Sequence, residues 1–321
     1  MVEHYLALIE KEISKQKFGN EPDSLYEPIR YIMNIGGKRL RPLLTLLSYS
    51  LYKEDAEKIV SYAVGVEAFH NFTLMHDDIM DNATLRRGKA TVHEKWNTNT
   101  AILSGDVMLV SVYDLFLGIE DSMLKQVLKT FNRCAAQVCE GQQWDMEFET
   151  REDVTQDEYI EMTRRKTAVL LGFSLELGAI LAGAPQEDQR LLRNFGINAG
   201  IGFQLKDDWL DVFADKDKLG KQIGGDIVAN KKTFLLLKAL ELAEGNQKIK
   251  LKNCIKEKNM NPLEKISSVT EIYNELSVPE IVRREIDHYF NEGLNQLDLI
   301  SKKEKTNSLR KFTESLINRQ F

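Results

Sequence analysis

The stretch LMHDDIMD, residues 74–81, sets three carboxylates into an otherwise apolar, helix-compatible run. On a helix, Asp77 and Asp81 are four residues apart and share one face, with their Cβ atoms roughly 5–6 Å apart. Two like charges at that distance repel each other unless a cation lies between them. The pattern returns in GFQLKDDWLD, residues 202–211, again in apolar surroundings. One copy would suit a helix cap with a solvated face, but two copies favour a cation-binding function.

The placement of proline predicts the fold class. None of the 6 prolines lies between residues 43 and 184, and proline in a helix interior costs about 3 kcal/mol or more. Apolar residues such as Leu43, Leu46 and Leu47 recur at helical spacing, and alternating strand patterns are scarce. We therefore expect an all-α protein with about ten to twelve helices and little or no sheet, packed as one bundle. No linker or repeat divides it, so residues 1–321 are predicted to form a single domain.

Composition excludes several classes of function. The 321 residues are 43% hydrophobic and 29% charged, with a net charge of −6, which argues against a general nucleic-acid binder. The 3 cysteines are too few and too irregular for a disulfide framework or a zinc site, and suit a reducing cytosol. The N-terminus lacks the features of a signal peptide, and no segment reaches the 18 or so apolar residues of a transmembrane span. We therefore expect a soluble, cytoplasmic protein without a transmembrane segment.

The aspartate motifs suit magnesium best among the common metals. Mg²⁺ takes oxygen ligands and typically binds one or two carboxylates plus substrate phosphates. A calcium loop needs alternating acids, a glycine and a distal Glu, which neither run has, and zinc prefers His or Cys. A di-iron bundle would use Glu-x-x-His pairs, which occur at Glu67 with His70 and at Glu285 with His288. The second pair lies in a polar region and neither explains the aspartates, so we favour magnesium with a diphosphate.

Basic side chains that could bind phosphate accompany both motifs. The segment GGKRLRP, residues 36–42, places three cations beside flexible backbone ahead of a predicted helix. Further candidates are Arg86, Arg87, Lys166, Lys221 and Lys231. Each alone is typical of solvated surface. Together with the acids they indicate two anionic substrates, or one of very high charge.

These motifs resemble those of the trans-type isoprenyl (polyprenyl) diphosphate synthases, in particular the short-chain members. The resemblance rests on GGKRLRP at 36–42, LMHDDIMD at 74–81, RRG at 86–88, KT at 166–167, GFQLKDDWLD at 202–211 and GK at 220–221. It implies an all-α bundle around a central cavity, usually a homodimer. It also implies condensation of isopentenyl diphosphate with an allylic diphosphate, which could be dimethylallyl, geranyl or farnesyl diphosphate.

The resemblance also implies a role for each matching residue. A cluster of about three Mg²⁺ ions on the allylic diphosphate would be bound by Asp77, Asp81 and Asp207. Supporting carboxylates, partly acting through metal-bound water, would be Asp78, Asp208 and Asp211. The same diphosphate would contact Arg86, Lys166 and Lys221. Isopentenyl diphosphate would lie in a metal-free pocket formed by Lys38, Arg41, His70 and Arg87. The cavity would be lined by Gln142, Thr167, Gln204 and Lys231. By itself, His70 also fits an ordinary core histidine.

The implied mechanism is electrostatic. Magnesium and bases neutralise the leaving diphosphate, the allylic C–O bond ionises, and the double bond of isopentenyl diphosphate attacks the carbocation.

The resemblance also concerns product length. Residues before Asp77 on its helix would form the floor of the tunnel that receives the growing chain. At a rise of about 1.5 Å per residue, Thr73 lies about 6 Å deeper than Asp77. An aromatic at Phe72 without a second at Thr73 is more like synthases with twenty-carbon products than fifteen-carbon ones.

Two other functions share much of this sequence logic. A class I terpene synthase would not need GGKRLRP or His70, because it does not bind isopentenyl diphosphate. A non-catalytic partner subunit of a prenyl diphosphate synthase would tend to lose aspartates or bases, and the motifs here are intact. The condensing synthase is therefore the favoured interpretation.

Overall fold

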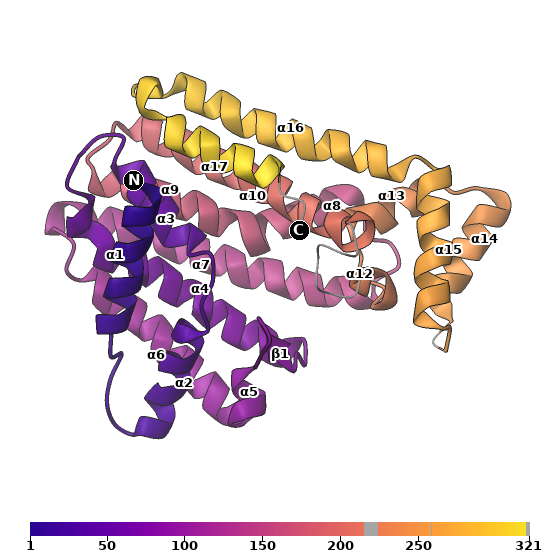
Figure 1. The fold of residues 1–321 in the computed structure, drawn as a ribbon, viewed down its shortest axis with the longest axis horizontal. Coiled ribbons are helices and arrows are strands. Elements are labelled where there is room, and N and C mark those ends of the chain that lie inside the picture. Colours follow the sequence, from indigo (N-terminus) through magenta and orange to yellow (C-terminus); the bar gives the residue numbers. More distant parts are fainter. Residues whose placement is uncertain (215–223, 258, 319–321) are drawn as a thin grey trace. The chain divides into compact units, whose positions relative to one another are not determined.

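The computed structural model describes residues 1–214, 224–257 and 259–318, and the all-α prediction is confirmed (Figure 1). Sheet within these residues is limited to one antiparallel hairpin, β1 (Leu85–Arg86) and β2 (Lys89–Ala90). The helices of the N-terminal half are α1 (Val2–Lys15), α2 (Asp23–Asn34), α3 (Leu40–Tyr49), η1 (Ala56–Ile59), α4 (Val60–Met80), α5 (Val92–Lys95), α6 (Thr98–Phe116) and α7 (Asp121–Thr150). Those that follow are α8 (Gln156–Thr163), η2 (Arg164–Ala168), α9 (Val169–Leu181), α10 (Gln186–Phe213), α12 (Gly225–Val228), α13 (Phe234–Leu242), α14 (Gly245–Lys256), α15 (Pro262–Glu275), α16 (Val278–Leu299), η3 (Lys303–Lys305) and α17 (Asn307–Ile317).

The chain forms two compact units, and each is described by itself. The first unit comprises Met1–Cys134, Leu170–Arg193 and Leu299–Leu309. The second comprises Ala135–Val169, Asn194–Asp298 and Arg310–Phe321. That residues 1–321 make a single domain stays a prediction.

Helix α4 lies at the centre of the first unit. It contacts α1, α2, α3, α5 and α6, and its residues Val64, Val66 and Ala68 are completely buried. A helix that is apolar on nearly all sides belongs in the interior of a protein. Toward its C-terminal end α4 carries more polar side chains, among them those of the first aspartate motif.

Aromatic rings lock α4 against its neighbours in the first unit. The ring of Phe131 lies 5.1 Å from Phe69, 5.3 Å from Phe116 and 5.7 Å from Phe173. Such pairs contribute about 0.5–1.5 kcal/mol each beyond the burial of their area. The ring of Phe116 lies directly over Gly65, where a Cβ atom would be only 2.9 Å away. This packing fixes the rotation of α4 and so decides which of its side chains face outward.

The second unit is held by caps and by close helix packing. Helix α8 begins with a capping box, in which Thr155 and Glu158 bond each other's backbone N–H groups. Its Tyr159 ring lies 6.3 Å from Phe234 on α13. On α10, Gly202 lets the ring of Phe290 on α16 approach to 3.2 Å from the position of a Cβ atom. These contacts position the second aspartate motif at the end of α10.

The polar helices α14 and α15 are part of the second unit. Helices α14 and α15 lie side by side (Figure 1), joined by the ion pair of Lys250 with Glu271 at 2.7 Å. Within the described residues, no helix is both long and apolar enough to cross a membrane.

Candidate active site

The first aspartate motif, residues 77–81, forms the last turn of α4. The backbone N–H of Asp81 donates to the carbonyl of Asp77 at 2.8 Å, so the two residues are one helical turn apart, as predicted. Asp77 is partly buried and Asp81 is exposed. Asp78, between them, is only 2% exposed. The first and last carboxylates of the motif are therefore far more accessible than the middle one.

The carboxylate of Asp78 is bound by Arg86. The Nε of Arg86 donates to both oxygens, at 3.0 and 2.9 Å, and Nη2 donates to Oδ1 at 2.7 Å. The hairpin β1–β2 makes this possible, because its turn residues Arg87 and Gly88 take positive φ angles of 52° and 75° and bring the strand back to α4. Asp78 therefore holds a cation beside the motif, which is compatible with its predicted supporting role.

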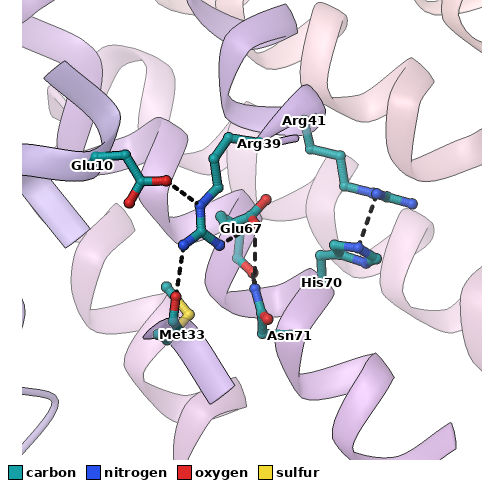
Figure 2. Close-up of polar contacts among 7 residues, drawn as sticks. All are labelled: Glu10, Met33, Arg39, Arg41, Glu67, His70 and Asn71. Carbon is teal, nitrogen blue, oxygen red and sulfur yellow. Dashed lines mark hydrogen bonds and ion pairs between the residues drawn. The ribbon is translucent and has the colours of Figure 1, made fainter. Parts of the chain in front are cut away.

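The basic segment 36–41 folds against α4 and the hairpin. Arg39 caps α3 with a left-handed φ of 47° and is only 4% exposed. Each of its three guanidinium nitrogens donates to a protein oxygen: Nε to Glu10 at 2.8 Å, Nη1 to Glu67 at 2.9 Å, and Nη2 to the carbonyl of Met33 at 2.7 Å (Figure 2). Arg39 is thus an internal cation, whereas its neighbour Lys38 is exposed.

His70 lies beside Arg41, as Figure 2 shows, with the Nη1 of Arg41 3.0 Å from the imidazole Nε2. Burial and the arginines Arg41, Arg87, Arg86 and Arg39 lower the pKa of His70 well below its ordinary value. The imidazole is therefore neutral, and its Nε2 accepts from Arg41. Burial lowers the pKa of Arg41 to about 10, so its guanidinium remains charged at neutral pH.

Arg87 completes this basic cluster. Its guanidinium lies against Gly37, where a Cβ atom would be 2.5 Å from Nη1. A side chain at this position would displace the guanidinium, and the φ of Gly37, 147°, is one that other residues rarely adopt. The first unit thus contains Lys38, Arg41, His70 and Arg87, the four residues predicted to bind isopentenyl diphosphate, and it places Arg41 against His70.

The two predicted chain-length residues precede the first motif on α4. Phe72 is 8% exposed and its ring lies 4.8 Å from His76 and 5.7 Å from Phe69. Thr73 is partly buried, and its hydroxyl donates to the carbonyl of His70 at 2.8 Å. Phe72 is thus part of an aromatic cluster, in an edge-to-face contact with His76, and its role in product length stays a prediction.

The second aspartate motif, residues 207–211, lies in the last turns of α10. Asp207 and Asp211 are partly buried, and Asp208 is 3% exposed. Asp208 accepts hydrogen bonds from the Tyr159 hydroxyl and from Gln204 Nε2, the latter at 3.0 Å. Burial raises the pKa of Asp208, and the charge of Lys231 opposes this rise. In this motif too, the middle carboxylate is buried and bonded.

Further carboxylates surround this motif in the second unit. The Oδ2 of Asp211 accepts from the backbone N–H of Asp226 at 3.0 Å. Burial raises the pKa of Asp226 to about 7, helped by the negative charges of Asp208, Asp211 and Asp145 and opposed by Lys231. Lys231 itself is exposed, and its N–H donates to the carbonyl of Asp226 at 3.0 Å. Such crowding of acids favours a cation in their midst.

A single π-helical turn, Arg164–Ala168, presents Lys166 and Thr167. The Nζ of Lys166 pairs with Asp145, and the Oγ1 of Thr167 lies 3.5 Å from Gln204. The turn fits against α7 only because residue 141 is glycine, since a Cβ atom there would be 2.2 Å from the backbone nitrogen of Lys166. Single π turns inside α-helices occur often at functional sites.

Gln142, the next residue on α7, is 7% exposed, and neither its amide nitrogen nor its amide oxygen has a hydrogen-bond partner within the described residues. A buried amide without partners is costly and suits a position that a ligand or water would complete. The second unit therefore contains Gln142, Lys166, Thr167, Gln204, Asp207, Asp208, Asp211 and Lys231 of the predicted site. Lys221 and the GK pair at 220–221 lie outside the described residues.

Comparison with known families identifies the fold and the motifs together. A family model with the description Polyprenyl synthetase matches residues 22–276, a range that contains both aspartate motifs and the basic segment. The chain belongs to the polyprenyl synthetase family.

Other members of the family are similar over most of their length. A geranylgeranyl pyrophosphate synthase from Geoglobus acetivorans is 42% identical over 237 residues, covering 73% of this chain and 74% of that protein. A short chain isoprenyl diphosphate synthase from Methanocaldococcus jannaschii is 38% identical over 268 residues, covering 83% and 81%. A crystal structure of a geranylgeranyl pyrophosphate synthase superposes with a TM-score of 0.95 at 42% identity, covering 100% of this chain and 99% of the other. The protein is therefore a prenyltransferase of isoprenoid biosynthesis.

The donor chemistry of this polyprenyl synthetase fits a hard cation that arrives with other oxygen ligands. No three or more His, Cys, Asp or Glu side chains among the described residues lie close enough to hold a metal ion by themselves. Asp77, Asp81 and Asp207 can supply only carboxylate oxygens. Mg²⁺ prefers such oxygens and commonly completes its shell with phosphate oxygens and water. The residues therefore fit Mg²⁺ bound together with a diphosphate.

Several residues of the site escaped the sequence analysis. The hairpin had a local signal, because Arg87-Gly88 between Leu85-Arg86 and Lys89-Ala90 suits a two-residue turn. The partners Glu10 and Tyr159 had no local signal, because each bonds to a residue more than 25 positions away. The π-helical turn also had none, since Arg164–Ala168 lies in an otherwise continuous helical pattern.

Proposed function

We propose that this prenyltransferase condenses isopentenyl diphosphate with an allylic diphosphate and gives mainly a twenty-carbon, all-trans prenyl diphosphate. The observation that carries the proposal is the basic cluster of the first unit. Arg41, neutral His70 and Arg87 lie together beside exposed Lys38. Such a cluster suits a second diphosphate that needs no metal, which a terpene synthase would not require. The similarity to geranylgeranyl pyrophosphate synthases supports the product length.

The basic residues are proposed to bind the two diphosphates by different means. Arg41 and Arg87 carry charge, and Lys38 is exposed, so these three suit the phosphates of isopentenyl diphosphate. Because the Nε2 of neutral His70 accepts from Arg41, its proton lies on Nδ1, from which it can donate to an anion. On the allylic side we assign Arg86, Lys166 and Lys221.

We assign Asp77, Asp81 and Asp207 as ligands of Mg²⁺, with Asp78, Asp208 and Asp211 in supporting positions. When bound, about three Mg²⁺ ions would neutralise charge on the leaving diphosphate. The burial of Asp78 and Asp208 and their hydrogen bonds to Arg86, Tyr159 and Gln204 support this division. Asp78 and Asp208 therefore hold these hydrogen-bonded side chains in place instead of facing outward.

The reaction that follows needs no protein nucleophile. The allylic C–O bond breaks, the double bond of isopentenyl diphosphate attacks the resulting carbocation, and a proton is lost to the departing diphosphate. Cationic side chains stabilise the charge that develops on the leaving oxygen. Gln142, Thr167, Gln204 and Lys231 are proposed to line the cavity, and apolar side chains would exclude water from the cation.

We also propose that the protein is a homodimer whose interface includes α6. Leu103, Val110 and Leu117 are spaced by seven residues along α6 and just past its end, and they are 57%, 60% and 63% exposed. A stripe of this length on one face is a self-complementary surface of the kind that a two-fold interface buries. Val110→Glu should therefore give a monomer in light scattering. Ile249→Glu, at a residue of equal exposure on α14, is the control and should leave the dimer intact.

The direct test of the reaction is product analysis by mass spectrometry. Purified protein receives labelled isopentenyl diphosphate, a short allylic primer and Mg²⁺, with EDTA in a parallel sample. We expect a Mg²⁺-dependent product of twenty carbons. If folded protein elongates none of several primers, the proposal fails and a terpene synthase or partner subunit takes its place. A cytoplasmic location, expected from the composition, stays a prediction.

A further inference from the structure

Two residues of α4, one turn apart, each bond one arginine of the basic segment. Glu67 accepts from Arg39 and His70 accepts from Arg41 (Figure 2). This is the Glu-x-x-His spacing that also occurs in di-iron bundles, but here both members bind guanidinium groups. We propose that Glu67 is a positioning residue, which acts through Arg39 to hold Lys38 and Arg41 in the arrangement that binds the diphosphate of isopentenyl diphosphate. The inference rests on the proposed function.

The contacts of the residues on either side of Lys38 are the geometric basis of the proposal. Gly37 lies against the guanidinium of Arg87, Arg39 bonds to Glu67, and Arg41 bonds to His70. Arg39 is buried and Arg41 is partly buried, whereas Gly37 and Lys38 are exposed. The direction of Lys38 and the start of α3 are therefore set by how firmly residue 39 is held.

The backbone at residue 39 needs side-chain contacts that hold it in its conformation. Arg39 has a φ of 47°, in the left-handed region that residues with a Cβ atom rarely adopt. Strained backbone of this kind persists only where the surroundings fix it. The three hydrogen bonds of the Arg39 guanidinium, to Glu67, Glu10 and the carbonyl of Met33, supply that constraint.

Among these partners Glu67 is distinguished by burial. The side chain of Glu67 is 3% exposed, and that of Arg39 is also 3% exposed, whereas that of Glu10 is 53% exposed. A buried pair interacts strongly because little water screens it, whereas an exposed partner contributes little. Glu67 also attracts Arg41 and Arg87. One carboxylate therefore counters the mutual repulsion of the guanidinium groups around it.

The competing explanation is that the pair serves only the stability of the fold. The two explanations differ in which kinetic constant a variant changes. A positioning role affects the Michaelis constant for isopentenyl diphosphate alone. A purely structural role impairs the binding of both substrates together, because the whole first unit loosens.

The test compares Glu67→Gln with Glu10→Gln, which alters the exposed partner of the same guanidinium. For Glu67→Gln we expect KM for isopentenyl diphosphate to rise about tenfold or more, the usual effect of removing a partner that orients a ligand-binding residue. KM for the allylic diphosphate should stay near that of the wild type, although the melting temperature should fall, because the buried charge of Arg39 loses its buried partner. Glu10→Gln should change KM less than about twofold.

A double variant guards against misfolding of Glu67→Gln. Replacing both members of a buried ion pair by apolar residues is often neutral for stability, so Arg39→Met with Glu67→Met should fold and should still raise KM for isopentenyl diphosphate. An unchanged KM in a folded double variant would overturn the proposal. So would a parallel loss for both substrates, or an equal effect of Glu10→Gln.

A binding measurement separates this inference from the proposed function. Inorganic diphosphate is titrated calorimetrically into wild type and Glu67→Gln without Mg²⁺, so that only the metal-free site is probed. Weaker binding by the variant supports the positioning role even if the wild type makes no prenyl product. Equal binding by the two proteins contradicts it, whatever reaction the enzyme performs.

Discussion

At the first aspartate motif the buried carboxylate of Asp78 accepts from the charged guanidinium of Arg86, whereas at the second motif Asp208 accepts from the uncharged groups of Tyr159 and Gln204. The surroundings differ in the same sense. Arginines gather around His70 near the first motif, and carboxylates gather around Asp226 near the second. One sequence pattern, Asp-Asp-x-x-Asp, therefore forms two environments of opposite charge. The pattern fixes the spacing of the carboxylates, and the neighbouring elements fix their electrostatics.

The largest expected effect is on kcat, and it comes from the first aspartate of each motif, a residue that the two motifs share. Asp77→Ala and Asp207→Ala should each lower kcat by about 100-fold or more, since each removes a group that serves the developing charge, while the melting curve stays unchanged. Steady-state rates with Mg²⁺ and thermal melts by circular dichroism measure both quantities. Asp287→Ala, at an exposed residue of α16, is the control. Near-normal rates in both aspartate variants would mean that neither motif serves the metal.

A second experiment tests the difference between the two middle carboxylates. Asp78→Asn leaves Arg86 without its bidentate partner and should lower the free energy of unfolding by about 2 kcal/mol. The pKa of Asp208 is raised, so the folded state binds its proton more tightly than the unfolded state does. At pH 7 the charged form of Asp208 therefore costs stability, and Asp208→Asn should lose less than about 1 kcal/mol. Urea unfolding at pH 7 measures both values, and equal losses would contradict the contrast.

The third experiment uses the residues five positions before each motif, and we expect its effect on rate to be the smallest. The first motif has Phe72 there, and the second has Gly202, whose space is taken by Phe290. Phe72→Ala should lengthen the main product by at least one isoprene unit, because it removes a proposed part of the tunnel floor. Gly202→Ala is the matched control and should lower the free energy of unfolding by about 1 kcal/mol without changing the product. Mass spectrometry of the products decides, and an unchanged chain length in Phe72→Ala would remove Phe72 from the floor.

Sequence reasoning reached the fold class because helical periodicity is a local property. The apolar spacing of Leu43, Leu46 and Leu47 on α3 and the absence of proline between residues 43 and 184 both operate within a few turns of the chain. The one-turn separation of Asp77 and Asp81 follows from the same helical geometry and is confirmed by the backbone hydrogen bond between them. The family resemblance, which the comparison with known proteins confirms, also rests on short local motifs.

The three cations of GGKRLRP show where sequence reasoning ends. Lys38, Arg39 and Arg41 are alike in charge and adjacent in sequence, and only the fold separates them. Arg39 is committed to Glu67 and Glu10, which lie 28 and 29 residues away, whereas Lys38 stays exposed. Likewise, only the fold placed Gly141 against the backbone of Lys166. The sequence determined the helices, the paired aspartates and the family, because these depend on spacing along the chain. Tertiary structure decided which charged residues became internal supports, because burial and hydrogen-bond partners come from elements distant in sequence.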